Sequence, residues 1–201
     1  MSITGAVAGV RSRERQQATS VQMVSRNHLA RYMFAALYCR GVVLDAACGV
    51  GYGSCLLQSL GCQMLGIDID KDTIKTASEY YTGPQYVCGD VCELNLALRF
   101  DWVVSFETIE HLPDPTPALK SFRQCSPRLI CSVPNELVLP FRAEDFAGDQ
   151  YPHQRHYTPD EFEGLLRSTG WNTIERHCQQ SKKNPEVIPG DAGAYLVYAC
   201  T

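Results

Sequence analysis

Three glycines follow a short apolar run in the first quarter of the chain. Residues 42–54 read VVLDAACGVGYGS, with glycines at positions 49, 51 and 53. Glycine permits positive φ and lets the backbone approach a ligand closely, and a helix that begins here would offer free N–H groups. The pattern is typical of a nucleotide-cofactor loop. Taken alone, the same glycines are explained equally well by a structural turn from a strand into a helix.

Acidic residues accompany this loop and the ends of the next two apolar runs. Asp45 lies four residues before the first glycine, Asp68 ends the second run and Asp90 follows the third. An acid at the end of the second run, such as Asp68, can accept hydrogen bonds from both hydroxyls of a ribose. An acid after the third run, such as Asp90, can accept a hydrogen bond from the exocyclic amine of adenine. Each acid alone is better explained as a helix cap or a solvated strand end. Together with the glycine loop, the three favour a nucleoside site.

Two carboxylates and an imidazole stand together in Glu107-x-x-Glu110-His111, and His153 follows in a later loop. His111 is the first candidate for a general base, with Glu110 and His153 as further catalytic candidates. Alternatively, the site holds a divalent cation that binds an oxygen atom of the substrate. Its ligands would be Glu107, Glu110, His111 and His153. A third interpretation is that these side chains only pack or anchor their loops. Imidazoles and carboxylates in loops are commoner than four-ligand sites, which favours the metal-free alternative.

The elements that position these residues follow from hydrophobic periodicity. Strand-length apolar runs alternate with helical segments, which predicts a parallel sheet covered by helices on both faces. The predicted strands are 42–46, 63–69, 85–88, 100–106 and 128–133, and the helices between them are 54–60, 70–80 and 117–125. Asp70 is a predicted N-cap, and Thr158-Pro159-Asp160-Glu161 is a capping box for one more helix. The runs 172–179 and 194–200 predict an antiparallel hairpin, because no helix fits between them.

Two further segments flank this pattern. Residues 17–37 predict one or two helices with His28, Leu29, Tyr32 and Ala36 on one face. Residues 136–157 have no regular period, and a long irregular loop in a compact domain is often a lid or a binding element.

Composition limits the class of protein. With 201 residues, of which 45% are apolar and 20% charged, the chain suits one compact domain. We expect a flexible segment at 1–16 and a single domain at 17–201. The net charge of −4 supplies no general attraction for a phosphate backbone, so a nucleic-acid partner is not expected.

The cysteines and the apolar runs indicate a compartment. Ten cysteines include no C-x-x-C pair, so we expect free, buried thiols, among them Cys88 and Cys131, in a reducing cytosol. There is no secretory leader pattern and no run of about 20 apolar residues. A soluble cytoplasmic protein is the expectation.

The glycine spacing separates two families of cofactor-binding proteins. Nicotinamide-binding proteins use G-x-G-x-x-G with the pyrophosphate at the helix terminus. This chain has G-x-G-x-G instead, and Asp45 precedes it. The negative charge of Asp45 suits an ammonium or a sulfonium better than a pyrophosphate. With the terminal hairpin added, residues 28–200 resemble the class I S-adenosylmethionine-dependent methyltransferases. The resemblance implies a three-layer α/β Rossmann-like fold with a seven-stranded, mostly parallel sheet in the order 3-2-1-4-5-7-6, in which strand 7 is antiparallel.

The resemblance also implies roles for individual residues. Asp45, Ala47, Gly49 and Gly51 would hold the methionine part, and Asp68 would bind the ribose. Ile69 would lie on the adenine face, Asp90 beside the adenine amine with Val91 next to it, and Phe106 beside the methyl group. The helix that carries His28, Arg31 and Tyr32 would close over the methionine carboxylate.

The second half of the chain is similar to several branches of this superfamily. The E-x-x-E-H set with a later histidine is similar to quinone-biosynthesis O-methyltransferases and to small-RNA 3′-terminal 2′-O-methyltransferases, in which a histidine matching His153 completes a metal site. The stretch 28–36 resembles methyltransferases of glycan pathways. We therefore expect O-methylation of a small molecule or of a nucleotide-linked or lipid-linked sugar, with a metal-dependent RNA enzyme as the alternative. A cofactor-binding regulatory module is the non-enzyme alternative, which the intact Glu110 and His111 argue against.

Overall fold

A computed structural model describes residues 24–94, 96, 98–181 and 184–201 of the chain. Its α-helices are α1 (Arg26–Tyr38), α2 (Tyr52–Ser59), α3 (Lys71–Tyr80), α4 (Thr116–Cys125) and α5 (Pro159–Ser168). Its strands are β1 (Val42–Ala46), β2 (Gln63–Asp68), β3 (Gln85–Cys88), β4 (Trp102–Phe106), β5 (Leu129–Pro134), β6 (Thr173–Gln179), β7 (Val187–Pro189) and β8 (Tyr195–Cys200). The described residues also form the short 3-10 helices η2 (Val91–Glu93), η3 (Ile109–His111) and η4 (Ala143–Phe146). The segment 1–16, expected to be flexible, lies outside the described residues.

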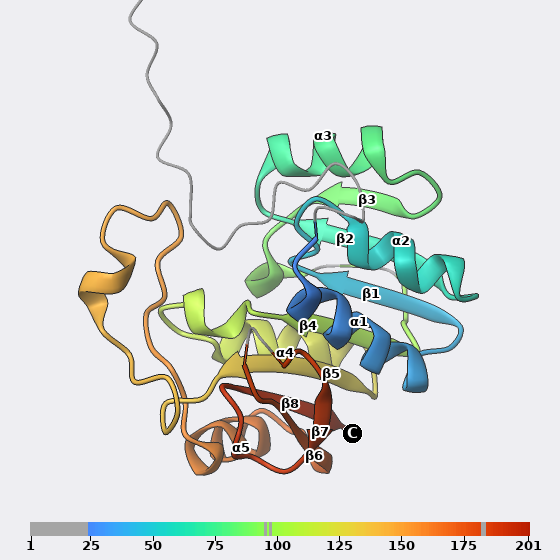
Figure 1. Ribbon diagram of the computed structural model, residues 1–201. Helices are drawn as coiled ribbons and strands as arrows, with labels where there is room; N and C mark the ends of the chain where they lie inside the picture. The colour runs from blue at the N-terminus through green and yellow to red at the C-terminus, as the bar shows by residue number, and fades with distance from the viewer. Residues whose placement is uncertain (1–23, 95, 97, 182–183) are drawn as a thin grey trace, which may run out of the picture.

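The strands form one sheet in the order β3-β2-β1-β4-β5-β8-β6-β7 (Figure 1). The first five strands are parallel, and β8 runs antiparallel to both β5 and β6. The predicted order 3-2-1-4-5-7-6 is therefore confirmed, as is the terminal hairpin.

The strand count of seven was wrong by one edge strand. β7 pairs with β6 through His177↔Pro189 and Cys178↔Ile188, and it lies between the two runs of the predicted hairpin, where no strand was predicted. A proline is tolerated there because an edge strand needs no donor on its outer side.

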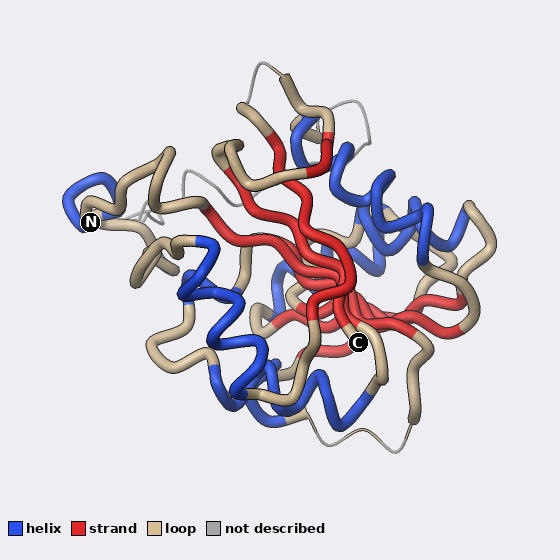
Figure 2. Tube along the Cα trace, turned by 90° about the horizontal axis from the view of Figure 1, so that it is seen from below, coloured by secondary structure: helices blue, strands red, loops and turns tan. Residues whose placement is uncertain are grey.

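Helices cover both faces of the sheet, and Figure 2 shows the strands as a twisted layer between them. On one face, Phe34 and Ala35 of α1 and Leu57 of α2 pack over Val43 and Val104. On the other face, α4 and α5 bury Phe122 and Phe162 against the sheet. Both faces of β1 and β4 are therefore covered by helices, as expected for central parallel strands.

Local signals in the sequence fix several helix ends. Asp70 caps α3 by accepting from the N–H groups of Asp72 and Thr73. Thr158 and Glu161 form the predicted capping box at the start of α5. Such caps satisfy N–H groups that the first helical turn leaves without partners.

The four residues predicted to share one face of the first helix differ in burial. Tyr32 is buried and His28, Leu29 and Ala36 are half-buried, while α1 also buries Asn27, Arg31, Phe34 and Ala35. The polar members are tolerated because Gln179 of β6 accepts from Arg31 Nη1 at 2.9 Å and donates to the carbonyl of Asn27 at 3.0 Å.

All ten cysteines are free, as expected. Seven are buried, and Cys131 is among them. The expectation for Cys88 was wrong, because β3 is the outermost strand of the parallel side and leaves that residue exposed. Among the described residues, every helix is too short or too polar to cross a bilayer.

Candidate functional site

A cavity of about 510 Å³ opens at the carboxyl ends of the parallel strands. The predicted cofactor residues that line it are Ala47, Gly49, Asp68, Ile69, Asp90, Val91 and Phe106. The order of the strands places them there, since β1, β2 and β4 end side by side at the point where the chain reverses its direction along the sheet. Asp45 and Gly51 do not line the cavity.

The glycine loop is bound to the end of β2 by hydrogen bonds. Asp68 accepts from the N–H of Gly49 at 2.9 Å with one carboxylate oxygen and from the N–H of Asp70 at 3.0 Å with the other. Gly51 has φ +87 and caps α2, and a Cβ on it would meet the Tyr86 ring at 2.6–2.8 Å. Gly51 therefore lets the chain turn tightly beneath a tyrosine, a requirement that the sequence did not reveal.

Asp45 lies beneath the cavity, 1% exposed. It accepts hydrogen bonds from the hydroxyl of Ser54 at 2.6 Å and from that of Tyr32 at 3.0 Å. Burial raises the pKa of Asp45 to about 6, and these two hydrogen bonds act in the opposite direction. Tyr32 and Ser54 were missed as members of this cluster, because only the folded chain brings α1 and α2 to the same carboxylate.

Arg31 supplies positive charge to the cavity wall. Its side chain is 1% exposed, its Nη1 lies 3.8 Å from a Glu107 oxygen, and its guanidinium carbon lies 5.0 Å from the centre of the Tyr195 ring. Its buried Nε has no hydrogen-bond partner among the described residues. A buried donor of this kind suits an anionic group in the cavity, because an unsatisfied polar atom is costly.

The backbone is strained on both sides of the same cavity. Ala47 after β1 has φ 62 and Glu107 after β4 has φ 51, and both residues line the cavity. Left-handed φ at a residue other than glycine costs energy and clusters at functional sites.

The E-x-x-E-H residues separate into two groups. Glu110, His111 and His153 offer ligand atoms that all lie within 4.8 Å of one another, close enough to hold a metal ion. Glu107, the fourth predicted ligand, does not belong to this group. It accepts from the Ser132 hydroxyl at 2.7 Å and faces Arg31 instead.

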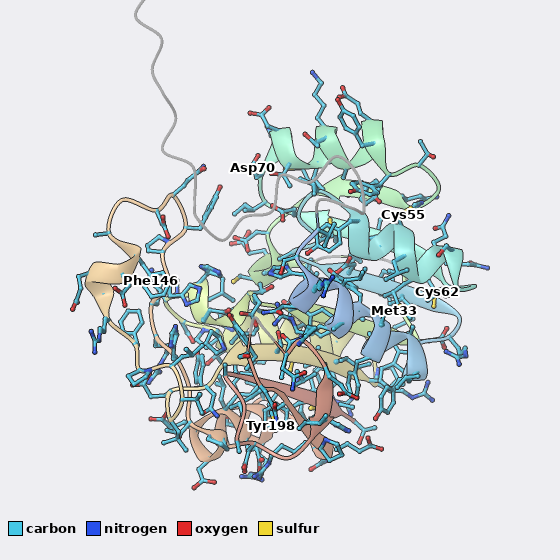
Figure 3. All side chains as sticks on the ribbon, in the orientation of Figure 1. Met33, Cys55, Cys62, Asp70, Phe146 and Tyr198 are labelled. Atoms are coloured by element: carbon cyan, nitrogen blue, oxygen red, sulfur yellow. The ribbon has the colours of Figure 1, made fainter. Side chains whose placement is uncertain are left out.

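The loop 136–157 delivers His153 to this cluster. The N–H of Gln154 donates to the Glu110 carbonyl at 2.7 Å, and the His153 ring meets the His111 ring edge-on with centroids 4.5 Å apart. Phe146 of η4 stacks on the other face of His153 at 4.1 Å. Figure 3 labels Phe146 on this loop, which extends away from the sheet.

A chain of hydrogen bonds orients His153. His156 Nδ1 lies 2.6 Å from the carbonyl of Leu139, which can only accept, so this nitrogen carries a proton. Burial lowers the pKa of His156 and favours its neutral form, in which Nε2 accepts from Nδ1 of His153 at 2.9 Å. The Leu139 carbonyl therefore makes Nδ1 of His153 the donor in the pair of histidines.

Parts of the chain are similar to known proteins. Residues 44–126 match the family model described as a methyltransferase domain. A probable S-adenosylmethionine-dependent methyltransferase of Mycolicibacterium smegmatis is 33% identical over 118 residues, 56% of this chain and 46% of its own length. A ubiquinone biosynthesis O-methyltransferase of Coxiella burnetii is 34% identical over 84 residues, 39% of this chain and 36% of its own.

The fold has close counterparts among solved structures. A protein of Pyrococcus horikoshii superposes with a TM-score of 0.71 at 21% identity, covering 92% of this chain and 94% of that one. The chain spans about half the length, or less, of the curated relatives that it matches. The sheet order, the glycine loop and these matches agree: residues 44–126 are similar to a methyltransferase domain, and the chain has the fold of S-adenosylmethionine-dependent methyltransferases of known structure.

Proposed function

We propose that this chain transfers a methyl group from S-adenosylmethionine to an oxygen atom of a small molecule or of a nucleotide-linked or lipid-linked sugar. One observation carries the proposal. The cavity has a buried guanidinium from Arg31 on its wall, together with the carboxylates of Asp68 and Asp90. A ligand with a carboxylate, ribose hydroxyls and an adenine amine suits these charges.

Each group in the cavity has a part in this proposal. Arg31 would bind the methionine carboxylate through Nε, while Asp68 and Asp90 would accept from the ribose and the adenine. Ile69, Val91 and Phe106 would contribute apolar contacts around the ring and the methyl group. Ala47, Gly49 and Gly51 would shape the loop at the methionine part, and Asp45 would act from beneath through Tyr32.

When bound, S-adenosylmethionine supplies an electrophilic methyl carbon on a sulfonium sulfur. The residues of this chain would then align the acceptor and remove its proton. His111 is the candidate base, because its ring lines the cavity. Glu110 and His153 lie against it and would hold its orientation.

Calorimetry with S-adenosylhomocysteine and with NADH tests the cofactor. We expect S-adenosylhomocysteine to bind and Arg31→Gln to weaken its binding about tenfold or more, because a hydrogen bond between charged groups contributes roughly 1.5–3 kcal/mol. Arg167→Ala is the matched control, since that arginine is 59% exposed on α5 and far from the cavity wall. Tighter binding of NADH would overturn the proposal, and binding without methyl transfer to any pool of acceptors would favour a regulatory module.

A metal-dependent reaction is a second candidate, including terminal 2′-O-methylation of RNA. It is favoured by the cluster of Glu110, His111 and His153, whose donors would hold a hard divalent cation against vicinal hydroxyls. Methyl transfer measured with and without EDTA decides between the two. Full activity in EDTA supports His111 as a direct base, whereas loss that added Mg²⁺ or Mn²⁺ restores supports the metal. His153→Ala would then raise the concentration of metal required and leave the affinity for S-adenosylhomocysteine unchanged.

A further inference from the structure

A second cavity, of about 370 Å³, lies under the loop 136–157. Its walls are largely carbon, from Pro134, Val138, Leu139, Pro140 and Phe146. Small-molecule sites are commonly apolar cavities of this size with a few polar groups at fixed places.

The second cavity adjoins the first. Tyr195 lines both, and Arg31 stacks over the Tyr195 ring from the cofactor side. His111 lines the first cavity and His153 the second, with their ring centroids 4.5 Å apart. A ligand in the second cavity would therefore have one end at the imidazole pair and at the border of the cofactor site.

Part of the polar lining already has hydrogen-bond partners or faces solvent. Both ring nitrogens of His156 are engaged, one with the Leu139 carbonyl and one with His153. Arg142 and Asp145 are exposed. A ligand inside the cavity thus meets carbon atoms and aromatic rings, with hydrogen-bonding groups at one end.

We propose that this second cavity holds the methyl acceptor and that the acceptor is a small hydroxylated aromatic ring, an inference that rests on the methyltransferase function proposed above. An aromatic ring fits because Phe146, His156 and Tyr195 offer ring contacts, and its hydroxyl would lie at the imidazole pair. A sugar fits worse, because hydroxyls that face the carbon atoms of Pro134, Val138, Leu139 and Pro140 would lose water without gaining partners.

The transfer balances in this arrangement. The acceptor oxygen forms the new bond to the methyl carbon, the carbon–sulfur bond breaks with its electron pair left on sulfur, and the hydroxyl proton passes to the imidazole of His111.

Two neighbouring residues provide a matched pair of variants. Val138 lines the cavity and is 43% exposed, so Val138→Trp adds bulk at the cavity without burying a new side chain in the core. Leu137 is 69% exposed and does not line it, so Leu137→Trp is the control. Catechol and methyl α-glucoside are the two probes, each assayed by calorimetry in the presence of S-adenosylhomocysteine and by methyl transfer from S-adenosylmethionine.

We expect catechol to bind and to be methylated in preference to methyl α-glucoside. Val138→Trp should raise the KM for catechol about tenfold with a smaller change in kcat, the pattern of lost binding. Its affinity for S-adenosylhomocysteine should match that of Leu137→Trp and of the unchanged protein.

A protein that binds S-adenosylhomocysteine but binds or methylates catechol no better than methyl α-glucoside overturns this inference and leaves the proposed function in place. Equal KM values in the two variants also overturn it. Failure to bind S-adenosylhomocysteine at all removes the proposed function, and the inference with it.

Discussion

The cofactor half of the site and the acceptor half are built in different ways. Around the first cavity, Asp68 binds the backbone of Gly49, and Tyr32 and Ser54 bind Asp45, so backbone and side chains form one tight cluster at the strand ends. Around the second cavity, the loop 136–157 is attached by a few contacts, among them the bond from Gln154 to Glu110. Precise placement is therefore concentrated on the side of the proposed cofactor, while the acceptor side depends on one long loop.

Glycine substitutions offer the strongest test of this contrast. A Cβ at Gly53 would lie 2.0 Å from the Tyr32 ring, so Gly53→Ala must push away the tyrosine that binds Asp45. We expect a loss of roughly 1–3 kcal/mol in the free energy of unfolding, typical of overpacking, and a steep loss of affinity for S-adenosylhomocysteine. Urea denaturation and calorimetry measure the two effects.

The matched change in the acceptor half is Gly148→Ala. This residue has φ +88 and nothing within 4 Å of an added Cβ, so the cost is backbone strain of about 1–2 kcal/mol, confined to the loop. Cofactor affinity should not change.

Gly164→Ala in α5, also with open space around it, should stabilise the protein by up to about 1 kcal/mol and shows that alanine itself does no harm. Equal losses of cofactor affinity at Gly53 and Gly148 would contradict the contrast.

The same contrast explains which parts the sequence could predict. The cap at Asp70 and the capping box at Thr158 lie within a few residues of the groups they serve, so local patterns revealed them. The glycine loop and Asp68 were recognised from their places at the ends of apolar runs. The alternation of strands and helices predicted a parallel sheet, and the family resemblance implied the order of its strands.

The rest depends on contacts between distant segments. Arg31 is buried with a partner that lies 148 residues away, since its Nη1 donates to Gln179, and no local pattern in α1 indicates this pairing. Glu107 faces Arg31 and not the histidines for the same reason. The stacking of Phe146 on His153 joins parts of an irregular loop that has no periodicity to interpret.

The smaller effect concerns Asp45 and the pH dependence of stability. The pKa of Asp45 is about 6 in the folded protein and 3.8 in a model compound, because burial disfavours its charge. Between about pH 4 and pH 6 the folded state therefore holds a proton that the unfolded state has lost. The free energy of unfolding falls with rising pH wherever the folded state binds more protons than the unfolded state. A pKa shift of this size lowers it by roughly 3 kcal/mol.

Asp45→Asn isolates this contribution, because the amide oxygen still accepts from Tyr32 and Ser54 but does not titrate. We expect the free energy of unfolding of the unchanged protein, minus that of the variant, to decrease from pH 4 to pH 6 and to level off above pH 7. Urea denaturation at each pH measures it. If this difference in the free energy of unfolding rises from pH 4 to pH 6, Asp45 is stabilised as a carboxylate. Burial of its charge in the cofactor half then has no electrostatic cost. A difference that decreases places that cost beneath the proposed cofactor site, where a cationic ligand would offset it.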